Sequence, residues 1–160
     1  MVSMEDITAI YLLADLTEQM RKKLCPVTES RQFKEGEVIY EEGDRAENFY
    51  MLKRGKILLE VEISKQIIIA LESIKPGDAF GWSALIPGSS QISYAVCTDP
   101  CHVLVTPGEK FVGLLKEDHT MGYKIMDATM RILKTMLDRR TGQLLKVMSK
   151  QPDLRKLWGP

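Results

Sequence analysis

The residues best suited to chemistry lie in one glycine- and serine-rich segment, residues 75–95. Gly81 permits a backbone turn that other residues resist, and a short helical turn starting near Trp82 would leave free N–H groups at its start. Such groups attract anions, phosphates above all. Ser89 and Ser90 add hydroxyl donors on the loop that follows. The segment therefore indicates a pocket for a small anion, with a structural surface loop as the alternative.

Catalytic and metal chemistry have much weaker support. The chain has no G-x-S-x-G, H-E-x-x-H or P-loop motif. Cys97, Cys101 and His102 are close in sequence, but no second pair completes a four-ligand zinc site. A haem bound through His102 or His119 stays open, although a lone histidine is more often structural. We therefore expect no catalytic residue, no metal ligand and no enzyme activity.

The composition is that of an ordinary globular protein. The 160 residues are enough for one domain with a sizeable core, and 44% of them are hydrophobic. Lysine and arginine together number 22, as do aspartate and glutamate, so the net charge is zero. The zero net charge argues against binding to nucleic acid through a strongly positive surface, and we expect no nucleic-acid partner for this chain alone.

The start of the chain does not resemble a secretory signal. Glu5, Asp6 and Asp15 interrupt residues 1–23, where a basic and then apolar stretch would be needed. The longest apolar run, Ile67–Leu71, has the length of a strand rather than of a membrane span. The three cysteines form no C-x-x-C pair, which disfavours a disulfide scaffold. These features predict a cytoplasmic protein with no membrane partner.

The elements that must hold the segment are short strands between helices. Thr17 has the position of an N-cap, and Pro26 ends the helix that follows it. Arg54-Gly55 is a hairpin-type turn. Many short strands with glycine turns indicate a small roll or sandwich. Strands are predicted over residues 48–53, 56–63, 66–74, 93–97 and 101–105.

Helical periodicity returns after the last of these strands. Thr106 is predicted as an N-cap, with Pro107 at the first helical position. A long helix is predicted from Thr120 to about Met148, because apolar residues recur there at steps of three and four. Met126, Met130, Leu133 and Leu137 form its apolar stripe. The stripe fits two roles equally well, core packing or the seam of a homodimer.

Several motifs, in a fixed order, carry a family resemblance. They are the runs Gly36-Glu37-Val38-Ile39-Tyr40-Glu41-Glu42-Gly43-Asp44, Phe49 to Ile57, Pro76-Gly77-Asp78-Ala79-Phe80-Gly81, and Ala84-Leu85. From about Leu13 to about Leu137, the chain resembles the cyclic-nucleotide-binding domain of the Crp/Fnr superfamily. The resemblance implies a mainly β fold with flanking α-helices: an eight-stranded β-roll (double-stranded β-helix or jelly roll), N-terminal helices and a long C-terminal helix.

The resemblance also sets the expected domain limits and site. It implies one domain over residues 1–148, with the roll at about 27–106, C-terminal helices at about 107–148, and a tail at 149–160. It implies a phosphate-binding cassette whose ligand is a cyclic nucleotide or another small anion. The expected ligand-binding residues are Phe80, Gly81, Trp82, Ser83, Ala84, Leu85, Ser89, Ser90, Gln91, Ile92 and Ser93.

Two cassette positions depart from the family pattern. Where the family has a glutamate that holds the ribose hydroxyl, this chain has Trp82, and where it has an arginine that pairs with the phosphate, this chain has Gln91. Each lost contact is worth about 1.5–3 kcal/mol, which together lowers affinity by roughly two to four decades. The Trp82 ring would fill part of the sugar site or stack on a different ligand.

Two functional hypotheses follow from the resemblance. The first is a non-catalytic sensor or regulatory module that binds a small ligand. The second is a degenerate relative that binds no nucleotide and acts as an interaction or scaffold domain, as a homodimer or with a partner protein. Transcription factors of this family continue into a helix-turn-helix domain after the long helix. The sequence printed here ends at Pro160, so we expect a stand-alone form.

Overall fold

A computed structural model describes residues 2–151 and residue 153 of the chain. The chain divides into two compact units, Met1–Met126 and Asp127–Pro160. The first unit holds every strand and the short helices of the described residues, and the second consists of the greater part of the last helix. The predicted limits of one domain over 1–148 and a tail over 149–160 stay a prediction.

Four short helical segments open the first unit. They are α1 (Met4–Thr8), η1 (Tyr11–Leu13), α2 (Glu18–Leu24) and η2 (Cys25–Val27). The predicted cap at Thr17 is confirmed, because its hydroxyl accepts a hydrogen bond of 3.3 Å from the backbone N–H of Met20. A cap of this kind satisfies an N–H that has no partner within the helix. α2 ends at Leu24, two residues before the proline that was expected to stop it.

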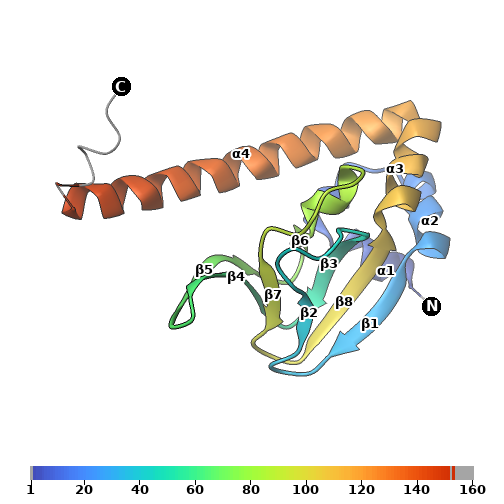
Figure 1. Cartoon of the computed structure of the whole chain (residues 1–160). Helices are drawn as coiled ribbons and strands as arrows, with labels where there is room; N and C mark the ends of the chain where they lie inside the picture. The colour runs from blue at the N-terminus through green and yellow to red at the C-terminus, as the bar shows by residue number, and fades with distance from the viewer. Residues whose placement is uncertain (1, 152, 154–160) are drawn as a thin grey trace. The chain divides into compact units, whose positions relative to one another are not determined.

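Eight strands form two four-stranded antiparallel sheets, as expected for a β-roll (Figure 1). The first sheet has the order β1-β8-β3-β6 and the second the order β2-β7-β4-β5. The bounds are β1 Glu29–Phe33, β2 Val38–Tyr40, β3 Asn48–Arg54, β4 Ile57–Ser64, β5 Ile67–Ile74, β6 Ala79–Phe80, β7 Tyr94–Cys97 and β8 Cys101–Pro107. The predicted architecture of the roll is confirmed.

The core of the roll lies between the two sheets and contains a group of three aromatic rings. Phe80 stacks on Tyr50 with ring centroids 5.1 Å apart, and Tyr40 lies 5.5 Å from Tyr50. Burial raises the pKa of the Tyr40 hydroxyl, to which the Ser93 side chain is hydrogen-bonded. Branched side chains from both sheets complete this cluster, among them Leu52, Ile57, Leu59, Ile74, Val103 and Val105.

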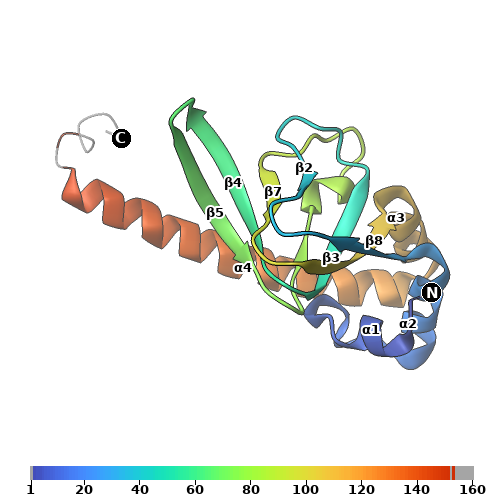
Figure 2. The same ribbon diagram turned by 90° about the horizontal axis from the view of Figure 1, so that it is seen from below.

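The β4–β5 hairpin extends beyond the rest of the second sheet, on the side away from the N-terminal helices (Figures 1 and 2). At its base, the predicted turn at Arg54-Gly55 is confirmed, with Gly55 at φ 100°. A side chain at Gly55 would clash with the backbone and thiol of Cys101, since a Cβ there would lie 2.6 Å from the Pro100 carbonyl oxygen. Glycine is therefore required at this turn.

Two helices follow the last strand, α3 (Gly108–Glu117) and α4 (His119–Lys150). The predicted Thr106 cap is wrong: Pro107 is the N-cap, and Thr106 belongs to β8. Its hydroxyl is 2.8 Å from that of Thr28, so a tertiary contact occupies the group that would have capped the helix. The predicted long helix is confirmed. Residues 152 and 154–160 of the predicted tail lie outside the described residues.

The buried thiols yield a first prediction. Cys97 and Cys101 are 1% and 3% exposed, and burial raises the pKa of the Cys97 thiol to about 12, with the Cys101 thiol adding to the shift. Burial keeps a reagent away from both sulfur atoms, and the raised pKa of Cys97 also keeps that thiol from forming the reactive thiolate, so neither should react at neutral pH. In the native protein, a thiol reagent such as 5,5′-dithiobis(2-nitrobenzoate) should titrate the half-buried Cys25 alone, and all three cysteines after denaturation. Fast labelling of Cys97 in the native state would contradict this.

Candidate functional site

The candidate site is the segment that links β6 to β7. Gly81 adopts a left-handed conformation (φ 75°, ψ 35°) directly after β6 and begins the single helical turn η3 (Trp82–Leu85), which confirms the helical turn predicted near Trp82. A Cβ on residue 81 would lie 2.7 Å from the Tyr50 ring. A second left-handed glycine, Gly88, turns the chain after η3. These glycines give the segment its shape, because other residues adopt such angles only with strain.

The far end of this segment is joined to the β2–β3 loop by main-chain hydrogen bonds. The Gly43 N–H donates to the Gln91 carbonyl at 2.8 Å, and the Gln91 N–H donates to the Asp44 carbonyl at 2.8 Å. The Ala46 N–H donates to the Ser89 carbonyl at 3.0 Å. The Asp44 carboxylate in turn accepts from the Glu41 N–H at 2.9 Å. The loop therefore fixes the backbone of the segment without using its side chains.

The Trp82 side chain packs into the protein beneath η3. Its ring meets Phe49 edge-on, with centroids 5.2 Å apart, and Phe49 stacks on Phe111 of α3 at 5.1 Å. Phe49 and Phe111 are fully buried. The indole N–H of Trp82 is buried and has no hydrogen-bond partner among the described residues. This tryptophan therefore connects the helical turn to the packing between β3 and α3.

Gln91 is the most distinctive polar residue of the segment. It is 6% exposed, and its backbone N–H and carbonyl are both bonded to the β2–β3 loop. Its side-chain amide makes no hydrogen bond with any residue that the structure describes. An amide can donate and accept at once but brings no charge. Gln91 is therefore available to a polar ligand, with weaker attraction for an anion than an arginine would exert.

The expected site residues differ in their accessibility. Phe80, Gly81, Ala84, Gln91 and Ser93 are buried, Trp82, Ser83, Leu85 and Ser89 are half-buried, and Ser90 and Ile92 are exposed. The expected site residues thus form one short continuous stretch of main chain, but two of their side chains are used within the protein. Phe80 packs in the core, and the Ser93 side chain is hydrogen-bonded to Tyr40.

Charges around the segment are mainly negative. No residue from Phe80 to Ser93 is charged, whereas the adjoining β2–β3 loop carries four carboxylates against the single guanidinium of Arg45. Arg45 lies 3.9 Å from Glu47. The four acids are Glu41, Glu42, Asp44 and Glu47, and all are exposed. Solvent screens exposed charges, so this loop opposes a bound anion only modestly.

A contact between η3 and α3 was not foreseen from the sequence. The first residue of α3, Gly108, lies so close to η3 that a Cβ there would be 2.2 Å from the Ala84 carbonyl oxygen. The Gly108 N–H donates to the Glu47 carbonyl at 2.8 Å. The β2–β3 loop residues that hold Ser89 and Gln91 were also missed as site residues. The Glu42-Gly43-Asp44 turn in this loop is recognisable in the sequence, but there it indicates only the fold and not a contact with the site.

Replacing Gly108 by alanine should therefore force η3 and α3 apart. We expect Gly108→Ala to lower the free energy of unfolding by about 1–3 kcal/mol, as overpacking does in other cores. Gly113→Ala is the matched control, because it lies in the same helix with nothing within 4 Å of the added Cβ. That change should be neutral or stabilise by up to ~1 kcal/mol. Urea unfolding of both variants tests the difference, and equal stabilities would contradict the contact.

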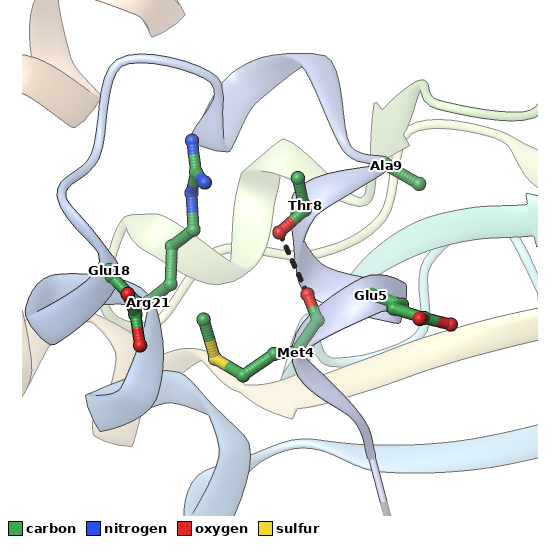
Figure 3. A pocket seen from close by; sticks show the side chains of 6 residues that line it. All are labelled: Met4, Glu5, Thr8, Ala9, Glu18 and Arg21. Atoms are coloured by element: carbon green, nitrogen blue, oxygen red, sulfur yellow. Dashed lines mark hydrogen bonds between the residues drawn. The ribbon is translucent and has the colours of Figure 1, made fainter.

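A pocket of about 550 Å³ lies elsewhere, between α1 and α2 (Figure 3). Its most prominent polar group, the Arg21 guanidinium, donates to the Leu13 and Ala14 carbonyls at 3.2 and 2.7 Å. Glu18 forms an ion pair of 2.6 Å with Lys22. Arg21 is the lining residue that could attract an anion, and its guanidinium already has partners within the protein, so the β6–β7 segment is the better candidate for binding a small anion.

Metal clusters, membrane-spanning helices and a helix-turn-helix unit after α4 are all absent from residues 2–151 and 153. These residues contain no cluster of three or more histidine, cysteine, aspartate or glutamate side chains placed to hold a metal ion. Their helices are either too short or too polar to cross a membrane. No helix-turn-helix unit follows α4 in this part of the chain.

Comparison with known proteins places the site within a conserved type of domain. The sequence profile of the cyclic nucleotide-binding domain matches residues 30–118, which is more than half of the chain and includes the whole β6–β7 segment. The chain is 35% identical over 80 residues to a cAMP-dependent protein kinase regulatory subunit of Eremothecium gossypii, covering 50% of this chain and 17% of that protein. The regulatory subunit of Hypocrea atroviridis is 28% identical over 122 residues, covering 72% and 25%. The chain thus spans a quarter or less of these relatives.

Solved structures agree on the fold. A candidate cyclic nucleotide-binding protein from Geobacter metallireducens is 26% identical, with a TM-score of 0.73 and coverage of 86% of this chain and 99% of that one. A cyclic nucleotide-binding domain from Methylobacillus flagellatus is 17% identical, with a TM-score of 0.76 and coverage of 89% and 80%. At 17% identity, the similarity to the Methylobacillus flagellatus domain shows a shared fold and nothing about function.

Proposed function

Since the chain belongs to the cyclic nucleotide-binding domain family, we propose that it is a non-catalytic regulatory module that binds a small ligand at the cassette Phe80–Ser93. The observation that carries this proposal is the geometry of the cassette. Its left-handed glycine, its helical turn and its main-chain bonds to the β2–β3 loop are all present.

We propose a cyclic nucleotide as the family-default ligand, held more weakly than in relatives with the usual glutamate and arginine. Gln91 supplies an uncharged amide where the arginine would be. The Trp82 ring packs on Phe49, which leaves its buried N–H as the polar group at that position. The loss of two charge-assisted contacts lowers the expected affinity by roughly two to four decades.

The signal would pass from the cassette to the helices. Ala84 of η3 lies against Gly108 at the start of α3, and Trp82 reaches Phe111 of the same helix through Phe49. A ligand that shifts η3 must therefore shift α3 or strain both contacts. Coupling of this kind requires that the ligand bind one arrangement of the helices better than another.

We further propose that α4 forms a homodimer seam. Met126, Met130, Leu133 and Leu137 are 46%, 62%, 41% and 62% exposed, and they recur at steps of three and four along the helix. Exposed apolar stripes of this period are typical of helix pairs. The ligand would then act on the pairing of two α4 helices.

The second candidate function is an interaction or scaffold domain without a nucleotide. It is favoured by the absence of any charged side chain in the cassette and by the four exposed carboxylates beside it. Both features disfavour a phosphate. Such a domain would keep the fold and use its surface alone.

Isothermal titration calorimetry separates the two candidates. The full chain is titrated with cAMP, cGMP and cyclic dinucleotides up to millimolar concentration. Heat that saturates, and that is lost in a Gly81→Val variant shown by circular dichroism to be folded, supports the regulatory module. No heat with any of these ligands favours the scaffold function and rejects the proposed ligand class.

A further inference from the structure

The side-chain amide of Gln91 is unpaired and still open to a ligand. The residue is only 6% exposed, and its amide makes no hydrogen bond with any residue that the structure describes. Neither amide atom is fully enclosed, however, so solvent reaches both of them. The indole N–H of Trp82 is enclosed and therefore out of reach. The cassette thus offers a ligand one donor and one acceptor at the same buried position.

The surroundings of this amide do not favour a charged ligand. No residue from Phe80 to Ser93 is charged, and η3, with four residues, is too short for the dipole of a full helix. The guanidinium of the β2–β3 loop, on Arg45, lies beside Glu47. A phosphate bound here would lose water without gaining a cation, which costs free energy. A cationic ligand gains little either, because the loop carboxylates are exposed and screened.

The chemistry of a carboxamide indicates what its partner must be. The group carries an acceptor oxygen and a donor nitrogen side by side. Its complement is a group with a donor and an acceptor on one edge, such as a nucleobase. Glutamine binds the amino and ring-nitrogen edge of adenine in this way in protein–DNA complexes. Both hydrogen bonds form without any charge, and a buried polar group that lacks them is costly.

From these observations we propose that the preferred ligand of the cassette is an uncharged nucleoside, whose base meets the Gln91 amide through one donor and one acceptor. A nucleoside is the part of a cyclic nucleotide that remains when the charged phosphate is removed. The inference rests on the ligand site proposed above and narrows its ligand class. A cyclic nucleotide still binds, but more weakly than the nucleoside with the same base.

Titration calorimetry of the full chain with two matched pairs of ligands tests the inference. The pairs are adenosine with cAMP and guanosine with cGMP, and the members of each pair share a base and a sugar but differ in the cyclic phosphate. In at least one pair, the nucleoside should bind roughly tenfold or more tightly than the cyclic nucleotide, because no unpaired charge is buried. Raising the salt from about 50 to about 500 mM should change the nucleoside affinity by less than about twofold.

Two variants at residue 91 test the role of the amide. Gln91→Met keeps the volume but removes both hydrogen-bonding groups, and it should weaken the nucleoside roughly tenfold or more. Gln32→Met makes the same replacement at an exposed position of β1 and should leave the affinity unchanged. Gln91→Arg should reverse the order of the pair, with the cyclic nucleotide bound more tightly than the nucleoside. Circular dichroism shows whether each variant is folded.

The comparison of nucleoside with cyclic nucleotide uses the native chain, so it stands even where a variant at residue 91 fails to fold. Cyclic nucleotides that bind as tightly as their nucleosides, or more tightly, would overturn the inference and leave the proposed ligand site intact. A nucleoside affinity that a folded Gln91→Met chain retains in full would also overturn it. No heat with any of the four ligands would instead reject the proposed function, and the inference with it.

Discussion

Gln91→Arg should raise the affinity for cAMP roughly ten- to hundredfold. The substitution puts a guanidinium at a buried position whose side-chain amide makes no hydrogen bond in the described residues. A charge-assisted contact with a phosphate is worth about 1.5–3 kcal/mol, which corresponds to this range of affinity. The exposed carboxylates of the β2–β3 loop offset part of the added positive charge. Titration calorimetry with cAMP measures the change directly.

Gln91→Met is the control for that prediction. It has nearly the same volume but neither charge nor hydrogen-bonding groups, so any gain it gives must come from packing. Gln91→Arg affinity no higher than that of Gln91→Met would show that residue 91 does not face the phosphate and would reject the cassette alignment. The double variant Trp82→Glu, Gln91→Arg should bind cAMP more tightly still. It should also be less stable, since a carboxylate replaces a ring that packs on Phe49.

Phe49→Ala should lower the free energy of unfolding by about 3–5 kcal/mol, the range found when a buried phenylalanine is truncated. Phe49 is fully buried and contacts both Trp82 and Phe111, so its removal opens a cavity between the cassette and α3. Most domains have a free energy of unfolding of only about 5–15 kcal/mol, so this single change should remove a large part of it. Urea unfolding followed by circular dichroism measures the loss.

Ile92→Ala provides the comparison for Phe49→Ala. Ile92 is 64% exposed, and truncation of an exposed side chain is expected to change stability by less than about 0.5 kcal/mol. A similar loss in both variants would mean that the aromatic contacts beneath η3 contribute nothing special. In that case the proposed route from the cassette to α3 through Phe49 would also be wrong.

The features that sequence reasoning anticipated are those with local causes. Arg54-Gly55 makes a turn because glycine tolerates the angle required, and Thr17 caps a helix through a partner three residues away. The helical turn at Trp82 follows from the glycine that precedes it. The long helix is anticipated for the same reason, since its period is visible within a few turns.

The features that escaped prediction depend on residues far apart in the chain. The Thr106 hydroxyl is engaged by Thr28, 78 residues away, and so does not cap α3. The direction of the Trp82 ring depends on Phe49 and Phe111, which lie on two other elements. Sequence spacing carries no information on such contacts. The identity of the cassette was therefore accessible through resemblance, but the packing beneath it was not.

The main-chain bonds between the cassette and the β2–β3 loop have a consequence for protein engineering. Because Ser89 and Gln91 are held through their backbone groups, the fold places few demands on the side chains of Ser89, Ser90 and Ile92, which are half-buried or exposed. The Gln91 side chain is buried and is therefore kept. A saturation library over the other three positions should consequently retain a high proportion of folded members. The segment is then a natural place to select new small-molecule sensors from a fixed scaffold.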